Sequence, residues 1–271
     1  AKIKKEQMQG VTHYMIDEWN PDEEFNVMIF QKLVKEIMED IYNRGMIPIL
    51  VGGTGFYIQA VLNDIAFTKE KQGDEIRADL QNLAKEKGAS YLHHELQKVD
   101  KESAEAIHPN NIKRVIRALE YFQSTGQKFS DHNKEERQKG SPYNFLYLVL
   151  TMNRKVLYER IDKRVDQMME EGLVKEVKQL LDAGYSRNLV SMQGLGYKEI
   201  ASALFKECTM EEAVYRLKRD TRHFAKRQMT WFRRERDVTM INKDIFSNNH
   251  EIVNYIMKLA VEKGICSCRE G

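Results

Sequence analysis

The sequence predicts an α/β fold in which parallel strands are covered by helices and a helical insertion interrupts the sheet. Residues 47–51 (IPILV) form a continuous apolar run, which is typical of a buried parallel strand. That run leads into Gly52-Gly53-Thr54-Gly55 and then into an apolar, helix-like segment. A long, strongly helical stretch separates this strand from the next apolar run, residues 145–151 (FLYLVLT).

The remaining elements follow from periodicity and from helix stop signals. Residues 11–17 (VTHYMID) are predicted to form a short strand, and residues 25–43 a helix that ends at Gly45. The helix prediction rests on apolar side chains that share one face: Phe25, Ile29, Leu33, Val34, Ile37, Met38 and Ile41.

The middle of the chain is predicted to be helical over residues 74–88 and 110–126, with Gly126 as a stop signal. Residues 130–142 (SDHNKEERQKGSP) are the predicted flexible connection. The chain then reads as helical from residue 153 to about residue 236. The expected domains are a first core part, a helical insertion and a second, mostly helical core part: 1–67, 68–140 and 141–271.

Composition favours a globular protein of the cytoplasm. Hydrophobic residues make up 42% of the chain and charged residues 31%. No apolar run approaches the roughly 20 residues of a membrane span, and no secretory signal opens the sequence. Cys208, Cys266 and Cys268 are too few for a disulfide framework, so we expect reduced thiols.

Net charge is only +2, but residues 216–236 hold nine Lys or Arg against two acids, with Phe224, Trp231 and Phe232 interleaved. Cations can meet phosphates while aromatic rings stack on bases, so this window favours nucleic acid binding. The alternative is a solvated helix face whose aromatic side chains belong to the core.

Three further motifs have candidate roles. Thr54 opens a helix at a glycine turn, where a hydroxyl and backbone N–H groups can bind a phosphate, although Thr is also an ordinary helix cap. Arg160 and Arg164 lie one turn apart and could grip a diphosphate, or they could pair with acids on their own helix. Lys198, in the turn GLGYKEI, could approach an unstacked base, or the turn could only connect two helices.

A basic cluster after His108-Pro109 is the fourth candidate. Lys113, Arg114 and Arg117 fall within the first turns of a predicted helix that Asn110 or Asn111 would cap, where they suit contacts to a phosphate backbone. Plain surface charge is the alternative, and His108 before a proline is expected to be structural.

Together, in this order, six segments resemble the tRNA dimethylallyltransferases, also called tRNA isopentenyltransferases. The segments are GGTGFY, DEIR, IHPNNIKRVIRALE, LYERIDKRVDQMMEEGL, GLGYKEI and AKRQMTWFR. The resemblance runs from the first residues to about residue 236. It implies a P-loop kinase-like core with a helical insertion that grips the anticodon stem-loop. It also implies transfer of a dimethylallyl group from its diphosphate to the exocyclic amine of the adenosine 3′-adjacent to the anticodon.

The resemblance also implies residue roles. Thr54 would line the reaction channel as a catalytic residue. The diphosphate would meet Arg160, Arg164 and the turn residues Gly52 and Gly53. The tRNA would contact these residues: Arg77, Lys113, Arg114, Arg117, Gly196, Tyr197, Lys198, Lys226, Arg227, Gln228, Trp231 and Arg233. Mg²⁺ bridging the diphosphate is the expected cofactor, and tRNA, dimethylallyl diphosphate and a monomeric state are the expected partners and assembly.

One departure from the family pattern concerns its first phosphate-binding loop, GPTxxGKT, and the D-S-x-Q segment whose aspartate is thought to deprotonate the amine. Neither occurs in this sequence, and Asp17 matches a different position, the aspartate of the strand H-x-L-I-D. We therefore expect an N-terminal piece outside this sequence to supply both, with GGTGFY as the opposite wall of the channel. A nucleotide or small-molecule kinase, a tRNA-binding module without catalysis and an adenylate isopentenyltransferase are the alternatives.

Overall fold

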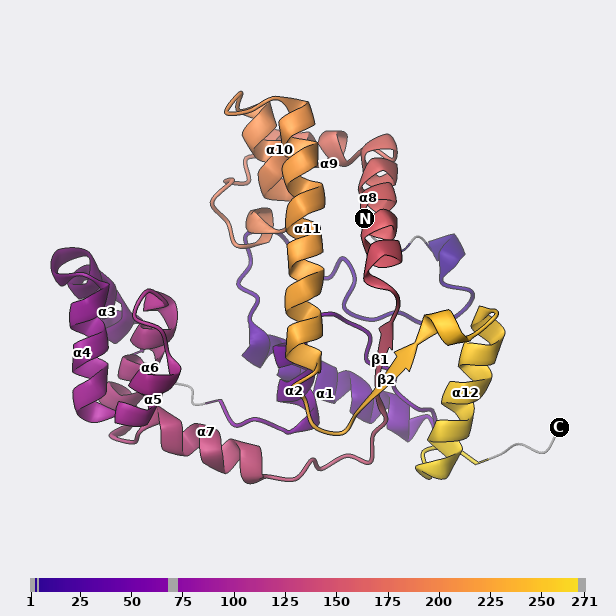
Figure 1. Ribbon diagram of the computed structural model, residues 1–271, viewed down its shortest axis with the longest axis horizontal. Helices are drawn as coiled ribbons and strands as arrows, with labels where there is room; N and C mark the ends of the chain where they lie inside the picture. The colour runs from indigo at the N-terminus through magenta and orange to yellow at the C-terminus, as the bar shows by residue number, and fades with distance from the viewer. Residues whose placement is uncertain (1–2, 4, 68–72, 268–271) are drawn as a thin grey trace. The chain divides into compact units, whose positions relative to one another are not determined.

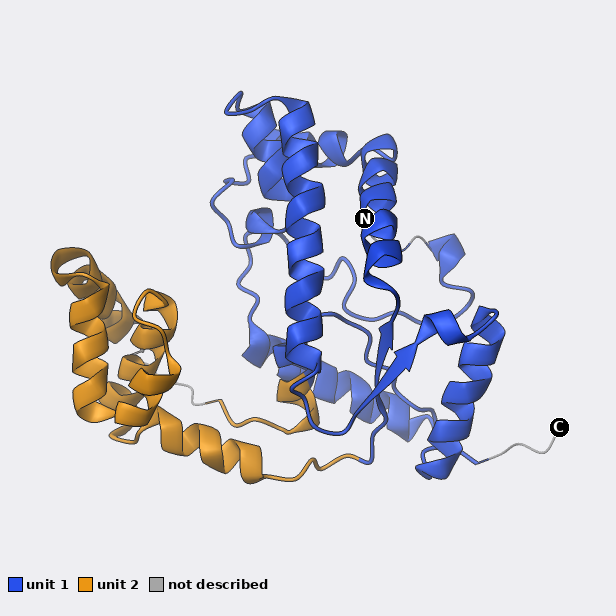
Figure 2. Cartoon of the chain, in the orientation of Figure 1, with its two compact units in different colours: residues 1–58, 144–271 blue, residues 59–143 orange. Residues whose placement is uncertain are grey.

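The computed structural model describes residues 3, 5–67 and 73–267, and the chain divides into two compact units (Figures 1 and 2). The larger unit comprises residues 1–58 and 144–271, and the smaller unit comprises residues 59–143. The smaller unit contains the helical insertion predicted for residues 68–140. Its role in tRNA binding stays a prediction.

The larger unit combines helices with a small parallel sheet. Its helices are α1 (Val27–Asn43), the start of α2 (Gly55–Leu62), α8 (Arg154–Glu170), α9 (Leu173–Asp182), α10 (Tyr197–Leu204), α11 (Met210–Phe232) and α12 (Asn249–Glu262), with 3₁₀ turns η1 (Lys5–Gln7), η2 (Ser191–Gln193) and η3 (Lys243–Ile245). Its strands are β1 (Tyr147–Thr151) and β2 (Val238–Asn242). The predicted α/β class is confirmed, and the third predicted strand appears as β1.

The sheet differs from the prediction in its members. β1 pairs in parallel with β2, from Tyr147 opposite Val238 to Thr151 opposite Asn242, and β2 was not predicted. The strands predicted for residues 11–17 and 47–51 are wrong, because neither segment joins a ladder in the described part of the chain. A strand needs a hydrogen-bonded neighbour. The run at 47–51 has none there, and it leaves Ile49 and Val51 83% and 87% exposed.

The helices of the larger unit follow their caps and apolar stripes. α1 begins after Asn26, whose side chain accepts from the N–H groups of Met28 and Ile29. Within the stretch from residue 153 to about 236 that was predicted to be helical, α8 and α9 are separate helices, because Gly172 turns the chain with φ +103°. One core joins α8 to α11 (Figure 1): Val165, Leu173, Val177, Met192, Ile200, Ala201, Ala213 and Leu217.

The smaller unit is a helical bundle around its own core. Beyond the end of α2, its helices are α3 (Gly73–Lys87), α4 (Ala89–Val99), α5 (Lys101–Ala106), α6 (Ile112–Thr125) and α7 (Phe129–Gln138). α6 ends at Gly126, which has φ +71°, as predicted. The flexible connection predicted for residues 130–142 is wrong, because most of it is α7. Buried Ser130 and Glu136 anchor that helix despite its polar sequence.

Asp100 ties the connection between α4 and α5 to α7. Its carboxylate, in a residue only 1% exposed, accepts from the Ser103 N–H (3.0 Å), the Ser103 hydroxyl (2.6 Å) and the Ser130 N–H (2.9 Å). Burial acts to raise the pKa of Asp100, but the hydrogen bonds from Ser103 and Ser130 outweigh it and lower the pKa below its usual 3.8.

We predict that Asp100→Ala lowers the free energy of unfolding at pH 7 by about 1–3 kcal/mol, because two buried N–H groups lose their acceptor. A lowered carboxyl pKa stabilises the fold above the unfolded-state pKa, and this contribution is lost as pH falls through the folded-state value. Urea unfolding of both proteins between pH 7 and pH 2.5 should therefore show the difference shrinking below about pH 4. A difference that stays constant with pH would contradict this account, and exposed Asp131→Ala is the control.

Candidate functional site

The glycine turn at residues 52–55 presents a free hydroxyl at the start of α2. The Thr54 carbonyl accepts from the N–H groups of Tyr57 (3.0 Å) and Ile58 (3.3 Å), so the backbone alone begins the helix. Thr54 is exposed, and its hydroxyl forms no hydrogen bond within the described residues. Its side chain is therefore not used as a helix cap and stays available to a ligand.

This turn lies directly against α11. The Gln228 amide Nε2 donates to the Gly53 carbonyl at 3.0 Å, and a Cβ on Gly53 would lie 2.1 Å from that nitrogen. A Cβ on Gly55 would lie 2.1 Å from Cδ1 of the Trp231 ring. A side chain at Gly55 would overlap the rigid Trp231 ring, whereas a side chain at Gly53 would displace the flexible amide end of Gln228 and break its hydrogen bond.

Gln228 and Trp231 thus have a structural task besides the tRNA contact that the sequence predicted. Trp231 also packs edge-to-face on Phe56, with ring centroids 6.4 Å apart. Its ring nitrogen Nε1 is buried without a hydrogen bond inside the described chain. Lys226, Arg227 and Arg233 are exposed, and a tRNA contact for all five residues stays a prediction.

The two candidate diphosphate ligands lie over one cavity. Arg160 and Arg164 are exposed on α8 and line a hollow of about 270 Å³. Thr221 of α11 adds a hydroxyl, and the rest of the lining is apolar: Ile161, Val165, Met168, Leu195 and Leu217. A polar rim over an apolar floor suits a small molecule that carries an anionic head and a short hydrocarbon chain.

The two arginines form few ion pairs with the acidic residues of their own helix. The sequence left open pairing within α8, but Asp162 pairs with Arg222 and Asp166 pairs with Lys218, both on α11. These two ion pairs join α8 to α11 and contradict the pairing of Asp162 and Asp166 within α8. Arg164 meets Glu171 at 3.4 Å in an exposed pair, whereas Arg160 forms no ion pair within the described residues.

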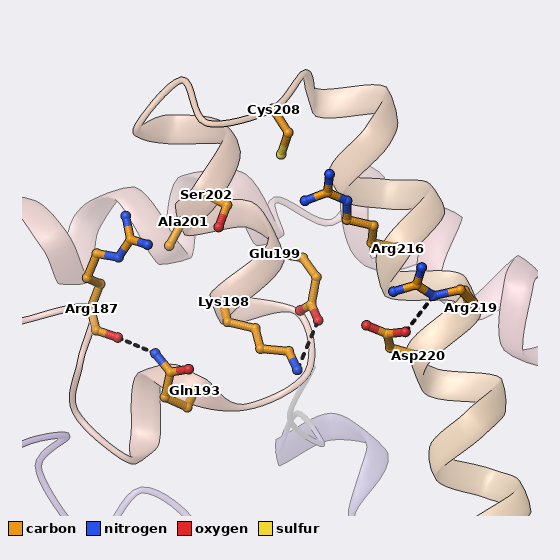
Figure 3. Close-up of a pocket in the computed structure, with 10 residues that line it drawn as sticks. All are labelled: Arg187, Gln193, Lys198, Glu199, Ala201, Ser202, Cys208, Arg216, Arg219 and Asp220. Carbon is orange, nitrogen blue, oxygen red and sulfur yellow. Dashed lines mark hydrogen bonds and ion pairs between the residues drawn. The ribbon is translucent and has the colours of Figure 1, made fainter. Parts of the chain in front are cut away.

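A second hollow, of about 530 Å³, opens between α10 and α11 (Figure 3). Lys198 lines it, while Gly196 lies at the α10 N-cap with φ +99°. The Tyr197 hydroxyl donates to Glu176 of α9, and burial together with that bond raises the Tyr197 pKa. Tyr197 therefore holds the turn inside the protein, and tRNA contacts of the three turn residues stay predictions.

The basic residues of the smaller unit divide into two kinds. Arg77 and Arg117 both pair with Glu120, which is only 2% exposed, through Nη atoms at 2.7 and 3.3 Å. A buried carboxylate needs such partners, so these arginines support the fold while 44% and 42% of their side chains stay exposed. Lys113 and Arg114 are exposed, and all four remain predicted tRNA contacts.

His108 has a local structural role, as predicted. Its Nδ1 accepts from the Asn110 N–H at 3.2 Å, just before α6. Asn111 occupies the N-cap position of α6, although its side chain makes no capping hydrogen bond.

Sequence reasoning missed the side chains that complete the two hollows. The smaller hollow is lined by Thr221, and the larger one by Gln193, Glu199 and Arg216. Glu199 and Arg216 stood inside motifs that were singled out, but only the fold shows that they face a shared space.

Metal, membrane and thiol features add little to the site. Among the described residues, no group of three or more His, Cys, Asp or Glu could hold one metal ion. No helix within those residues is long and apolar enough to cross a membrane. Cys208 and Cys266 are free thiols, and Cys268 lies outside the described residues.

The comparisons with known proteins agree on one family. The sequence model of the IPP transferase family matches residues 1–235. A tRNA dimethylallyltransferase of Lachnoclostridium phytofermentans is 56% identical over 98% of this chain and 85% of its own length. The tRNA dimethylallyltransferase of Acetivibrio thermocellus is 46% identical over the same shares.

Solved structures give the same result. A tRNA isopentenylpyrophosphate transferase of Bacillus halodurans superposes with a TM-score of 0.69 at 42% identity, covering 97% of this chain and 83% of that protein. A eukaryotic dimethylallyltransferase acting on tRNA superposes with a TM-score of 0.72 at 27% identity, covering 89% and 62%.

We predict that Gly53→Ala displaces the Gln228 amide and lowers the free energy of unfolding by about 1 kcal/mol, the usual contribution of one hydrogen bond. Gly52→Ala is the matched control, because a Cβ there meets nothing within 4 Å. Thermal unfolding should separate the two variants, and equal melting temperatures would contradict the packing of the turn on α11.

Proposed function

Because the chain belongs to the IPP transferase family, we propose that it transfers a dimethylallyl group from dimethylallyl diphosphate to the exocyclic amine of the adenosine 3′-adjacent to the anticodon in tRNA. The observation that carries this proposal is the match over 98% of the chain to a tRNA dimethylallyltransferase at 56% identity. The GGTG turn and the arginine-rimmed hollow are the local features that support it.

The reaction joins the adenosine nitrogen to the allylic carbon and breaks the bond from that carbon to the diphosphate oxygen. Negative charge grows on the leaving oxygens, and the amine releases one proton to the solvent, so the products are the alkylated adenosine, diphosphate and a proton. Donors that are already in place stabilise such charge without reorganisation. In the proposed arrangement, Arg160 and Arg164 bind the diphosphate with forked N–H groups, and Thr54 donates its hydroxyl from the turn.

Mg²⁺ is part of the proposal only as a companion of the diphosphate. The acids in the described residues do not form a cage for it, whereas Mg²⁺ commonly binds through phosphate oxygens and water with few protein ligands. When bound, it would neutralise charge on the diphosphate. The chain's own contribution is to orient that group.

The tRNA side of the proposal rests on exposed cations. Exposed Lys226 and Arg227 immediately precede Gln228 in α11, and exposed Arg233 follows the end of that helix. Exposed Lys113 and Arg114 lie in the first turn of α6 in the smaller unit. Such side chains suit phosphate contacts, which set affinity and salt dependence more than sequence preference. A monomeric protein in the cytoplasm is part of the same proposal.

Nucleoside mass spectrometry tests the proposal directly. The protein is incubated with dimethylallyl diphosphate, Mg²⁺ and an unmodified tRNA that carries adenosine beside the anticodon, while a gel shift reads binding in the same sample. Modified adenosine is expected, and a tRNA with guanosine at that position should gain nothing. Binding without transfer would support a tRNA-binding module instead, and the absence of both would overturn the assignment.

We predict that Thr54→Ala slows transfer by roughly ten- to a hundredfold, because one donor to the leaving group is lost. The gel-shift affinity for tRNA should stay within about twofold of the wild type, since Thr54 is not among the proposed tRNA contacts. Thr54→Ser, which keeps the hydroxyl, is the matched control and should recover most of the rate. Unchanged turnover in Thr54→Ala would remove this residue from the site.

We predict that Arg160→Ala raises the KM for dimethylallyl diphosphate by roughly tenfold or more, since one charge-assisted contact is worth about 1.5–3 kcal/mol. Arg164→Ala should have a smaller effect, because Glu171 already competes for that guanidinium. Lys163→Ala, an exposed cation on the same helix, is the control. Equal KM values for all three variants would place the diphosphate elsewhere.

A further inference from the structure

The hollow between α10 and α11 lies on a different side of α11 from the arginine-rimmed one. Arg216, Arg219 and Asp220 of α11 line it, whereas Leu217 and Thr221 line the other. At about 100° per residue, these two sets point more than a quarter turn apart. The second hollow is therefore separate from the proposed diphosphate site.

Its lining is charged, but most of the charges are already paired. Arg187 holds Glu207 through both terminal nitrogens, at 2.6 and 3.1 Å, and Arg219 holds Asp220 at 2.7 Å. Arg216 differs, because it forms no hydrogen bond or ion pair within the described residues. An exposed guanidinium at the edge of a hollow is well suited to a phosphate group.

Glu199 supplies an unsatisfied acceptor in the same hollow. The residue is only 5% exposed, and its Oε2 accepts from the Gly196 N–H at 2.9 Å. Its Oε1 is buried and has no hydrogen bond; the Lys198 ammonium, at 3.5 Å, is within ion-pair range but too far for a hydrogen bond. A buried carboxylate oxygen in this state gains from a ligand N–H group.

Figure 3 shows Glu199 and Arg216 on facing elements, with both side chains directed to the space between α10 and α11. Gln193 borders the same space from η2, and its amide nitrogen donates to the Arg187 carbonyl at 2.7 Å. The volume of about 530 Å³ lies within the usual range for a small organic ligand. A ligand that fits this hollow would carry an anionic group for Arg216 and an N–H donor for Glu199. A nucleotide has both.

A line of exposed side chains leads along α11 away from this hollow. We call it the basic tract: Arg216, Arg219, His223, Lys226 and Arg227. Spacings of three and four residues place its members on one helix face. Phe224 beside it is 37% exposed, and the Arg227 guanidinium lies 5.6 Å from its ring centroid. Cations with an accessible aromatic ring suit single-stranded nucleic acid.

We propose that this hollow binds one unstacked nucleotide of the tRNA substrate, with its phosphate on Arg216 and an amino-bearing base edge on Glu199. The proposal rests on the proposed function and extends it to base selection. Adenine, cytosine and guanine carry an exocyclic amine that can donate to Glu199 Oε1. Uracil carries a carbonyl oxygen in its place, which the carboxylate repels.

The test uses anticodon stem-loop hairpins that keep the target adenosine and carry uridine at each other loop position in turn. Fluorescence anisotropy gives the Kd of each hairpin for the full chain. For the wild type, uridine at one loop position should weaken binding roughly tenfold, as expected for one lost base contact. No uridine penalty at any position would overturn the proposal.

Glu199→Gln is the informative variant, because a glutamine side chain can keep the hydrogen bond that Glu199 accepts from the Gly196 N–H. Its carbonyl oxygen can accept from the Gly196 N–H while its amide nitrogen faces the hollow and donates to uracil. The uridine penalty should fall below about threefold at that one position and stay unchanged at the others. An unchanged penalty would contradict the role of Glu199.

Arg216→Met tests the phosphate contact separately, and its result does not depend on whether Glu199→Gln folds normally. It should weaken binding of all hairpins alike and reduce the slope of log Kd against log salt by about 0.7, the loss of one single-strand phosphate contact. Lys258→Met on α12, a lysine whose side chain is 73% exposed, is the control and should change neither. An unchanged slope in Arg216→Met would contradict the phosphate contact.

Two further outcomes separate this proposal from the proposed function. Transfer to tRNA with no effect of either variant on hairpin binding would overturn only the nucleotide pocket. A wild-type chain that neither binds hairpins nor modifies tRNA would overturn both. A free nucleoside monophosphate that displaces the hairpin at micromolar concentration would show that the pocket serves a free nucleotide instead.

Discussion

The packing of a glycine turn against one long helix is the constraint on which the candidate site depends. Gly53 and Gly55 bring the backbone so close to α11 that a single added carbon would overlap Gln228 or Trp231. The turn is therefore held in place by its contacts with α11. Thr54 lies between the two glycines, so its position is fixed by the same contacts. Catalytic donors act best when their supports are rigid, since small displacements of a reacting group are costly.

The same helix also holds α8, which carries the two arginines proposed to bind the diphosphate. Ion pairs from Asp162 to Arg222 and from Asp166 to Lys218 join α8 to α11, so the arginines of α8 and the turn are positioned by one element. α11 also carries the basic tract on another face. A single helix thus supports a hollow suited to an anionic head with a short hydrocarbon chain on one side and a surface suited to RNA on the other. This arrangement explains why one stretch of sequence combines apolar, aromatic and cationic residues so densely.

The sequence predicted helices such as α1 and α6 because their signals are local, whereas polar α7 was mistaken for a flexible connection. α1 and α6 begin and end near asparagine and glycine residues that any reader of the chain can find. Strands depend on partners, so the apolar run at 47–51 predicted a strand that no neighbour completes in the described chain, and β2 went unnoticed in a polar context. The site shows the same limit. The four-residue spacing of Arg160 and Arg164 places them on one helix face. That Glu199 and Arg216 face the same hollow depends instead on how α10 and α11 pack.

A double-mutant cycle between Gly55 and Trp231 tests the central constraint most directly. Gly55→Ala should cost about 1–3 kcal/mol of unfolding free energy beside the native indole, as overpacking does. In a Trp231→Leu background, where the overlapping ring atoms are gone, the same change should cost less than about 0.5 kcal/mol. The rate of dimethylallyl transfer, measured on the same four proteins, should follow the same pattern. Equal costs in both backgrounds would show that the turn does not depend on α11, and the account of the site would fail with it.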